Sequence, residues 1–205
     1  MKKLALIPLT LLAATIVSTV AATAQQPKDL LPDLKKGGYV LFMRHPLTNP
    51  DQADTDPLNL DNINAQRQLS DDGRKQARAM GASFRALQIP VEKVISSKFQ
   101  RAQEGAKLMD VGEVTTSLDV SEGGLVVSTR ENQRRAKALR QLLSTPPAAG
   151  KNLVLVSHKP NLQDAAGKEF GDLNECEVVV FRPLGDGKFK AVARISPETW
   201  SQWAK

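Results

Sequence analysis

Both histidines of this 205-residue chain lie one residue beyond a short, continuous run of apolar residues. The first run spans Tyr39 to Met43 and ends in Arg44-His45-Pro46. The second spans Leu153 to Val156 and ends in Ser157-His158. Continuous apolar runs of this length are typical of strands buried on both faces, as in a parallel sheet that helices cover. The sequence therefore predicts two buried strands that each lead into a histidine.

The rest of the chain alternates between strand and helix patterns. Ser70 can cap a helix whose apolar face recurs at spacings of three and four residues, and Pro90 ends this segment. Further helices are predicted near 99–109, 132–143 and 161–170, and further strands at 91–96, 113–116, 177–181 and 189–195. Because the last two strands flank a Gly-Asp-Gly turn, we expect them to pair antiparallel. The fold class predicted is α/β: a three-layer α/β/α sandwich with a mostly parallel sheet and an antiparallel edge.

The N-terminal segment has the features of a secretory signal peptide. Lys2 and Lys3 precede an apolar stretch, and Ala22-Thr23-Ala24 is a small-x-small cleavage signal. An uncleaved membrane anchor is the alternative for this stretch. We expect residues 1–24 to be the signal peptide, 25–36 a leader and 37–205 one domain, in a periplasmic or secreted protein without a membrane span after cleavage.

Composition limits the kinds of site that the chain can build. The single cysteine, Cys176, excludes an internal disulfide and a cysteine-based zinc site, and two histidines are too few for a His-rich metal centre. We therefore predict neither a metal nor a cofactor. Cleavage of the signal peptide would leave 26 basic residues against 22 acidic ones, a net charge of +4. Aromatic residues make up only 4% of the chain, so binding of nucleic acid by base stacking is not expected.

Cationic side chains follow three of the predicted strands. Arg44 and His45 follow the first, Arg101 comes shortly after the strand at 91–96, and His158 follows the strand at 153–156. Ligands of open α/β sheets bind beyond the carboxyl ends of the strands, so these side chains are expected to meet there. Guanidinium groups match phosphate oxygens, and a neutral imidazole can attack phosphorus. Each residue taken singly is more simply explained as structural, but the convergence favours a phosphoryl-transfer site.

Four segments resemble motifs of the histidine phosphatase superfamily, the phosphoglycerate mutase-like proteins. They are, in chain order, 38–48 with Arg44-His45 and Thr48, 69–77 with Leu69-Ser70, 95–102 with Arg101-Ala102, and 154–158 with Ser157-His158. The resemblance spans about residues 37–196 and implies the phosphoglycerate mutase-like fold, specifically a small periplasmic phosphatase.

The resemblance also implies roles for individual residues. His45 would be the nucleophile that becomes phosphohistidine, and Arg44, Arg101, Thr48 and His158 would bind the phosphoryl group. Members often use a carboxylate to protonate the leaving oxygen. The candidates for this acid by position are Glu122 and Asp119, with Glu175 and Glu177 as further alternatives.

Three residues depart from the family pattern. Pro46 stands where glycine or alanine is usual, Asp51 where the mutases often have asparagine, and Lys159 where glycine is common. A proline at position 46 removes an N–H group that could have contacted phosphate.

The function predicted is a metal-independent phosphomonoester hydrolase that acts through phosphohistidine. Its substrate would be a phosphorylated envelope sugar, small molecule or protein. The alternatives are a catalytically silent phosphate- or anion-binding protein of the same fold and a basic envelope protein that serves protein contacts.

Overall fold

The computed structural model describes residues 27–123 and 127–205, and its centre is a six-stranded sheet in the order β3-β2-β4-β1-β5-β6. The strands β1 to β4 are parallel where they pair, whereas β5 and β6 form an antiparallel edge. The strands are β1 (Val40–Arg44), β2 (Val91–Ser97), β3 (Val114–Ser117), β4 (Asn152–Ser157), β5 (Val178–Gly185) and β6 (Lys188–Ile195). This topology confirms the mostly parallel sheet with an antiparallel edge.

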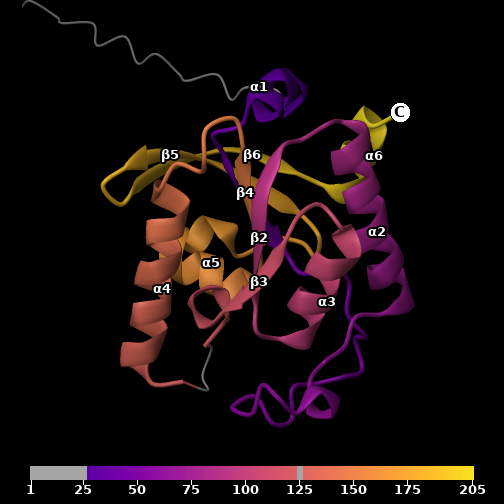
Figure 1. Cartoon of the computed structure of the whole chain (residues 1–205). Helices are drawn as coiled ribbons and strands as arrows, with labels where there is room; N and C mark the ends of the chain where they lie inside the picture. Colours follow the sequence, from indigo (N-terminus) through magenta and orange to yellow (C-terminus); the bar gives the residue numbers. More distant parts are fainter. Residues whose placement is uncertain (1–26, 124–126) are drawn as a thin grey trace, which may run out of the picture.

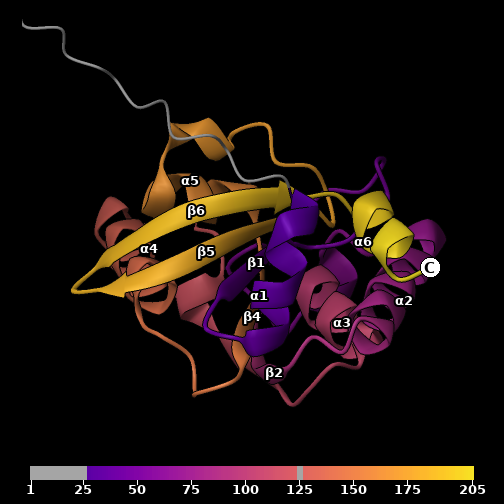
Figure 2. The ribbon, with the colours of Figure 1, turned by 90° about the horizontal axis from the view of Figure 1, so that it is seen from above.

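Helices cover both faces of the sheet, which gives the predicted three layers (Figures 1 and 2). One layer contains α1 (Leu31–Lys36), α2 (Asp71–Ala86), α3 (Gln100–Met109) and α6 (Pro197–Trp203). The opposite layer contains α4 (Thr129–Ser144) and α5 (Lys159–Ala166). Short 3-10 helices are η1 (Pro27–Leu30), η2 (Ile63–Ala65), η3 (Leu118–Val120) and η4 (Lys168–Phe170).

Alternate residues of the central strands fill two separate hydrophobic cores. In β1, Leu41 and Met43 pack toward α2 and α3, while Val40 and Phe42 pack toward α4 and α5. Successive side chains of a strand point to opposite faces, so a strand covered on both sides has to be apolar throughout. This requirement explains the unbroken apolar runs in the sequence.

Local capping determines where α2 and α4 begin. The Ser70 side chain accepts a hydrogen bond from the Gly73 backbone N–H at 3.0 Å, which confirms the predicted start of α2. Helix α4 begins at Thr129, three residues before the predicted start, because the Ser128 side chain caps it by accepting from the Glu131 N–H.

Two terminal segments of the described chain add helices that the sequence pattern did not predict. Leu30 and Leu34, within the segment treated above as a leader, are buried in the core on the α2 side. Near the C-terminus, Trp200 of α6 is fully buried with its ring centroid 4.7 Å from that of Phe84. The predicted signal peptide, 1–24, lies outside the described residues.

Among residues 27–123 and 127–205, no helix is both long and apolar enough to cross a membrane.

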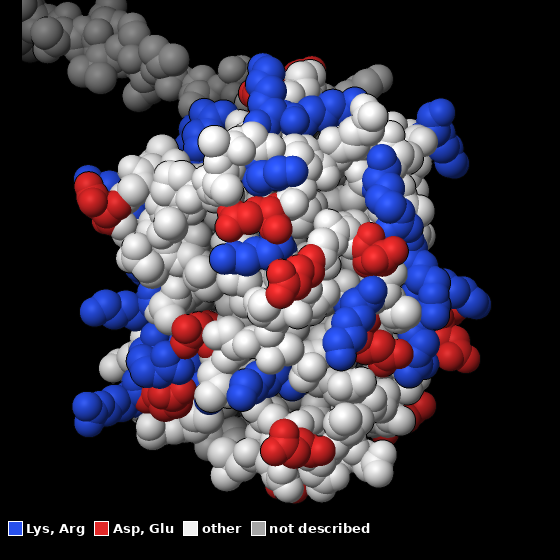
Figure 3. Space-filling view, in the orientation of Figure 1, with Lys and Arg blue, Asp and Glu red and all other residues white. Residues whose placement is uncertain are grey.

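Charged side chains of both signs are interspersed over the face shown in Figure 3. Such a surface is typical of a solvated exterior, on which opposite charges offset one another.

Candidate active site

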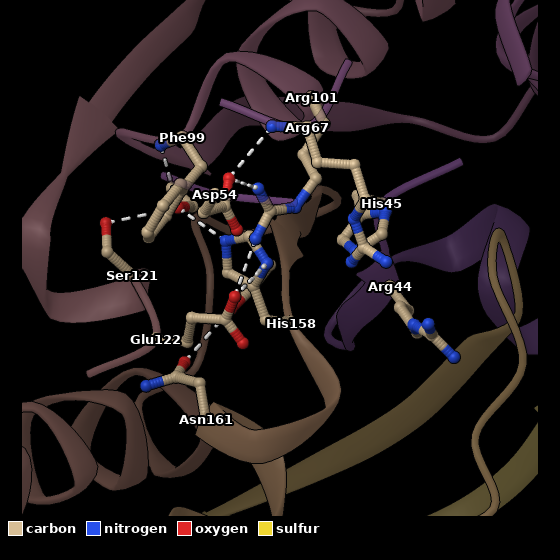
Figure 4. Close-up of polar contacts among 12 residues, drawn as sticks. Arg44, His45, Asp54, Arg67, Phe99, Arg101, Ser121, Glu122, His158 and Asn161 are labelled. Atoms are coloured by element: carbon tan, nitrogen blue, oxygen red, sulfur yellow. Dashed lines mark hydrogen bonds and ion pairs between the residues drawn. The ribbon is translucent and has the colours of Figure 1, made fainter. Parts of the chain in front are cut away.

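The two histidines meet because their strands are adjacent and in register. Arg44 of β1 lies opposite Ser157 of β4, so the next residue of each strand is a histidine at the same edge of the sheet. The ring centroids of His45 and His158 are 5.3 Å apart, and both side chains are buried (Figure 4). The His45 backbone N–H donates to the Ser157 carbonyl at 2.9 Å, which holds the ends of the two strands together.

Two arginines complete the cationic cluster. Arg101 lies in the first turn of α3, directly after β2, and is fully buried beside the two imidazole rings (Figure 4). Its guanidinium carbon lies 4.4 Å from the centroid of the Phe99 ring. Arg44, at the end of β1, donates from Nη1 to the Leu173 carbonyl at 2.7 Å. The structure thus brings together the four residues that the sequence placed at strand ends.

The contacts of His45 determine its protonation. Nδ1 lies 2.9 Å from the Pro46 carbonyl oxygen. Because a carbonyl can only accept, Nδ1 carries the proton and the neutral ring has its lone pair on Nε2. Burial, reinforced by the charge of Arg101, holds the pKa of His45 well below its usual range. The imidazole is therefore neutral at neutral pH and can act as a nucleophile.

A chain of hydroxyl groups determines the tautomer of His158. The Ser121 hydroxyl donates to the Ser117 carbonyl, and the Ser97 hydroxyl donates to Ser121. Each hydroxyl has one proton, so the 2.7 Å contact between His158 Nε2 and Ser97 Oγ takes its proton from the imidazole. Nδ1 of His158 is buried and has no hydrogen-bond partner within the described residues. Burial and the charge of Arg101 lower the pKa of His158 as well.

Glu122 is the candidate acid that the structure places beside Arg101 and His158. Its Oε1 atom lies 2.6 Å from Arg101 Nη2 and 3.6 Å from His158 Nδ1. Burial raises the pKa of Glu122, although the charge of Arg101 opposes this effect. The raised pKa favours the protonated form of this carboxyl group, which is the form that a general acid needs.

The other three candidate acids lie in different surroundings. Asp119 pairs with Arg134 at 2.6 Å on the partly exposed side of α4. Glu177 is bound by Arg194, which donates to both carboxylate oxygens. Glu175 does reach the cluster, but on the side of His45 opposite to the proposed nucleophilic nitrogen.

Glu175 links three of the residues expected to bind phosphate or react with it. Its Oε1 atom accepts from the Thr48 hydroxyl at 2.8 Å and lies 3.5 Å from Arg44 Nη2 and 3.7 Å from His45 Nδ1. The Thr48 hydroxyl proton is therefore donated to a carboxylate of the protein itself. The structure places Thr48 next to Arg44 through this carboxylate.

The three residues that depart from the family pattern lie in different surroundings in the fold. Pro46 contributes the carbonyl that holds His45, and its ring packs on α3, where a Cβ at Gly105 would lie 2.6 Å from Pro46 Cδ. Asp51 is exposed on the loop between β1 and α2. Lys159 is the first residue of α5 and directly follows His158.

Two residues of the site were not predicted from the sequence. Asp54, from the long loop before α2, lies 3.0 Å from Arg101 Nη1, and Ser97, the last residue of β2, contacts His158. Asp54 stands in an Asn-, Asp- and Pro-rich stretch without periodicity, so nothing local marks it. Ser97 could have been found, because polar residues at the end of a buried parallel strand face the binding edge.

A cavity of about 550 Å³ adjoins the cluster at Asp54, Phe99 and Glu122. Apolar side chains of the loop before α2, including Leu58 and Leu60, form part of its wall. A space of this size accommodates a small-molecule group beside the cationic cluster. Within the described residues, no group of three or more His, Cys, Asp or Glu is arranged to hold a metal ion.

Comparison with known proteins shows similarity to one family over part of the chain. The sequence model of the histidine phosphatase superfamily (branch 1) matches residues 40–123. A search of the curated proteins found no match. The protein histidine phosphatase SixA complexed with tungstate shares the fold with a TM-score of 0.55, 16% identity, and coverage of 78% of this chain and 97% of that chain.

Two further solved structures share the fold. One is a mutant phosphoserine phosphatase from Entamoeba histolytica in complex with phosphoserine, with a TM-score of 0.54, 15% identity, and coverage of 78% and 98% of the two chains. The other is a mycobacterial glucosyl-3-phosphoglycerate phosphatase complexed with VO3, with a TM-score of 0.54, 13% identity, and coverage of 77% and 98%. The chain is thus similar to the histidine phosphatase superfamily over residues 40–123, and it shares the fold of these solved structures.

Proposed function

We propose that the protein is a phosphomonoester hydrolase in which His45 is the nucleophile. One observation carries the proposal: the Pro46 carbonyl binds Nδ1 of His45, so the lone pair of the neutral ring is on Nε2, within a buried cluster of two arginines and a second histidine. A fixed, unprotonated imidazole beside concentrated positive charge is what attack on a phosphate ester requires.

The cationic groups would bind the phosphoryl oxygens. Arg101 has a buried Nε–H without a hydrogen-bond partner in the described structure, and Arg44 lies on the other side of His45 (Figure 4). These guanidinium groups would neutralise the oxygens during transfer, which is the main requirement for catalysis of this reaction. His158 would contribute Nδ1, either as a donor after protonation or as an acceptor from a protonated phosphoryl oxygen.

The reaction would proceed in two displacements at phosphorus. Nε2 of His45 forms a bond to phosphorus while the ester P–O bond breaks, and the leaving oxygen takes a proton from Glu122. Water then attacks the phosphohistidine and gives a proton to the Glu122 carboxylate. The P–N bond breaks, its electrons return to Nε2, and inorganic phosphate is released.

The cavity beside Glu122 supports a small-molecule leaving group. Its walls include Leu58, Leu60 and Phe99, so the part of the substrate beyond the ester oxygen would have apolar surface. On the basis of the N-terminal sequence alone, we propose that the enzyme is exported and acts on phosphomonoesters outside the cytoplasm.

Hydrolysis of p-nitrophenyl phosphate in the presence of EDTA tests the proposal. The wild-type protein should release phosphate, and His45→Ala should abolish the release. Rapid quenching in alkali, in which phosphohistidine survives, should show by mass spectrometry a phosphoryl group on a peptide that contains residue 45. Asp51→Asn, on the exposed part of the same loop, is the control and should match the wild type.

Two results would contradict the proposal in different ways. Binding of vanadate or phosphate without turnover would identify a silent anion-binding protein. Turnover that persists in the His45→Ala variant would show that another group is the nucleophile.

A further inference from the structure

Asp54 contacts the buried arginine of the site from a loop that has no regular structure at this point. Its Oδ1 atom accepts from Arg101 Nη1 at 3.0 Å and from the backbone N–H of Arg67 at 2.9 Å. The same carboxylate oxygen thus joins residue 54, the far end of the loop and the first turn of α3. Figure 4 shows Asp54 on the side of the guanidinium away from His45.

Further hydrogen bonds fasten the same loop to α3. The Thr55 N–H donates to the Ala65 carbonyl at 2.8 Å, which closes the loop on itself. The buried Gln66 accepts from the Gln100 N–H at 2.7 Å and donates to the Leu60 carbonyl at 2.8 Å. The position of Asp54 is therefore determined from both arms of the loop.

Asp54 and Glu122 share one guanidinium group. Glu122 pairs with Arg101 Nη2 at 2.6 Å, while Asp54 pairs with Nη1, so the planar group is held from two directions. Two anions bound to a single cation are only partly neutralised, so the charge of Asp54 makes the charged form of Glu122 less favourable. The repulsion from Asp54 accordingly raises the pKa of Glu122, in addition to the effect of burial.

Other charged groups also surround Glu122. Arg67, on the same loop as Asp54, lowers the pKa of Glu122, and His158 lies 3.6 Å away at the start of α5. From α4, the Arg135 guanidinium donates to the Glu122 backbone carbonyl at 3.0 Å and pairs with Glu131. Within the described residues, Asp54 is the only other carboxylate that pairs with Arg101.

We infer that Asp54 is a positioning residue, which orients Arg101 for the phosphoryl group and keeps the proton on Glu122. The inference rests on the proposed function, because it assigns Glu122 as the proton donor. Asp54 itself need not touch the substrate. It acts by holding the Arg101 guanidinium and by placing a negative charge beside the Glu122 carboxylate.

Three variants separate these two effects. Asp54→Asn keeps an acceptor oxygen of the same shape and removes the charge, whereas Asp54→Ala removes both. Asp51→Asn removes an equal charge from the exposed part of the same loop. The kcat/KM for an alkyl phosphate, whose leaving alkoxide needs a proton, is measured for each from pH 5 to pH 9 and divided by the wild-type value, so that titration of the substrate cancels.

Asp54→Ala should lower kcat/KM and the affinity for inorganic phosphate about tenfold, since a charge-assisted contact to the anion-binding arginine is lost. Asp54→Asn should retain most of the phosphate affinity. Without the repelling charge, however, Glu122 would lose its proton more readily, so activity should fall at a pH lower by roughly half a unit. The Asp51→Asn profile should overlie that of the wild type.

Two outcomes would overturn the inference. One is an Asp54→Asn profile that coincides with the wild type throughout the pH range. The other is an Asp54→Ala variant that binds phosphate as tightly as Asp54→Asn. Should Asp54→Ala not fold, the isosteric Asp54→Asn still decides through its pH profile. A wild-type protein without any hydrolysis would contradict the proposed function instead, and phosphate affinity would then still report on Arg101.

Discussion

Arg101 Nη2 lies 2.6 Å from Glu122 Oε1, although no solvent reaches the arginine side chain. This contact joins the proposed anion-binding group of the site to its candidate acid. A buried cation needs such partners, because an unpaired charge in the interior costs several kcal/mol. The same pair therefore connects stability, phosphate binding and proton transfer.

Arg101→Lys should weaken the binding of inorganic phosphate about 10- to 100-fold. Lysine keeps the charge but lacks the planar fork that reaches Asp54, Glu122 and the phosphoryl group together. Isothermal titration calorimetry with phosphate measures the change. The exposed Arg78 of α2 provides the control, since Arg78→Lys should bind phosphate as the wild type does. An unaltered affinity in Arg101→Lys would remove Arg101 from the phosphate-binding groups.

Glu122→Gln should lower kcat about 10²- to 10⁴-fold for alkyl phosphates and much less for p-nitrophenyl phosphate. The alkoxide that leaves an alkyl ester needs a proton, whereas p-nitrophenolate is stable without one. The amide keeps a hydrogen bond to Arg101, so the loss would come from the missing proton. Asp119→Asn, whose parent carboxylate pairs with Arg134 outside the cluster, should leave both substrates unaffected. Equal losses on both substrates would argue against a role of Glu122 as the acid.

The two buried histidines should make the free energy of unfolding depend on pH. Their folded-state pKa values are lowered, so the unfolded chain binds protons more readily below about pH 6.5. The stability from this source is fully present above that pH and is lost as the pH falls, by up to about 1.4 kcal/mol per pH unit for each histidine.

Urea unfolding at pH 7.5, 6.5 and 5.5 measures this dependence. Carboxyl groups titrate in the same range, so the useful quantity is the difference between the wild type and His158→Asn. This difference should shrink as the pH falls. If it stays constant over the range, His158 is not buried as a neutral ring.

Gly105→Ala should impair catalysis although Gly105 does not contact the reacting groups. A Cβ at this position would lie 2.6 Å from Pro46 Cδ, so Pro46 would have to move together with the carbonyl that orients His45. We expect kcat to fall about tenfold or more, since nucleophile alignment is sensitive to small displacements. Gly112→Ala, where the nearest atom would be 3.5 Å away, is the control. Full activity in Gly105→Ala would show that the Pro46 contact does not orient the histidine.

Local sequence determined the framework that carries the site. The apolar runs before His45 and His158 identified β1 and β4, because a strand covered by helices on both faces has no polar position. Ser70 identified the start of α2 through its capping hydrogen bond. Since parallel strands present their carboxyl ends at one edge, the approach of the two imidazoles and of Arg101 could be predicted before any pairing was known.

Tertiary structure alone decided which other groups reach that edge. Asp54 and Glu175 come from irregular segments, whose paths depend on packing against α3 and β1 rather than on any repeating pattern. Helix α6 likewise depends on a distant partner, because the burial of Trp200 requires the face of α2 that carries Phe84. The acceptor of His45 Nδ1 is the carbonyl of its neighbour Pro46, but the packing of the Pro46 ring against Gly105 of α3 was decided by the tertiary structure. Periodicity and capping act between near neighbours in the chain, whereas these contacts join segments that only the complete fold brings together.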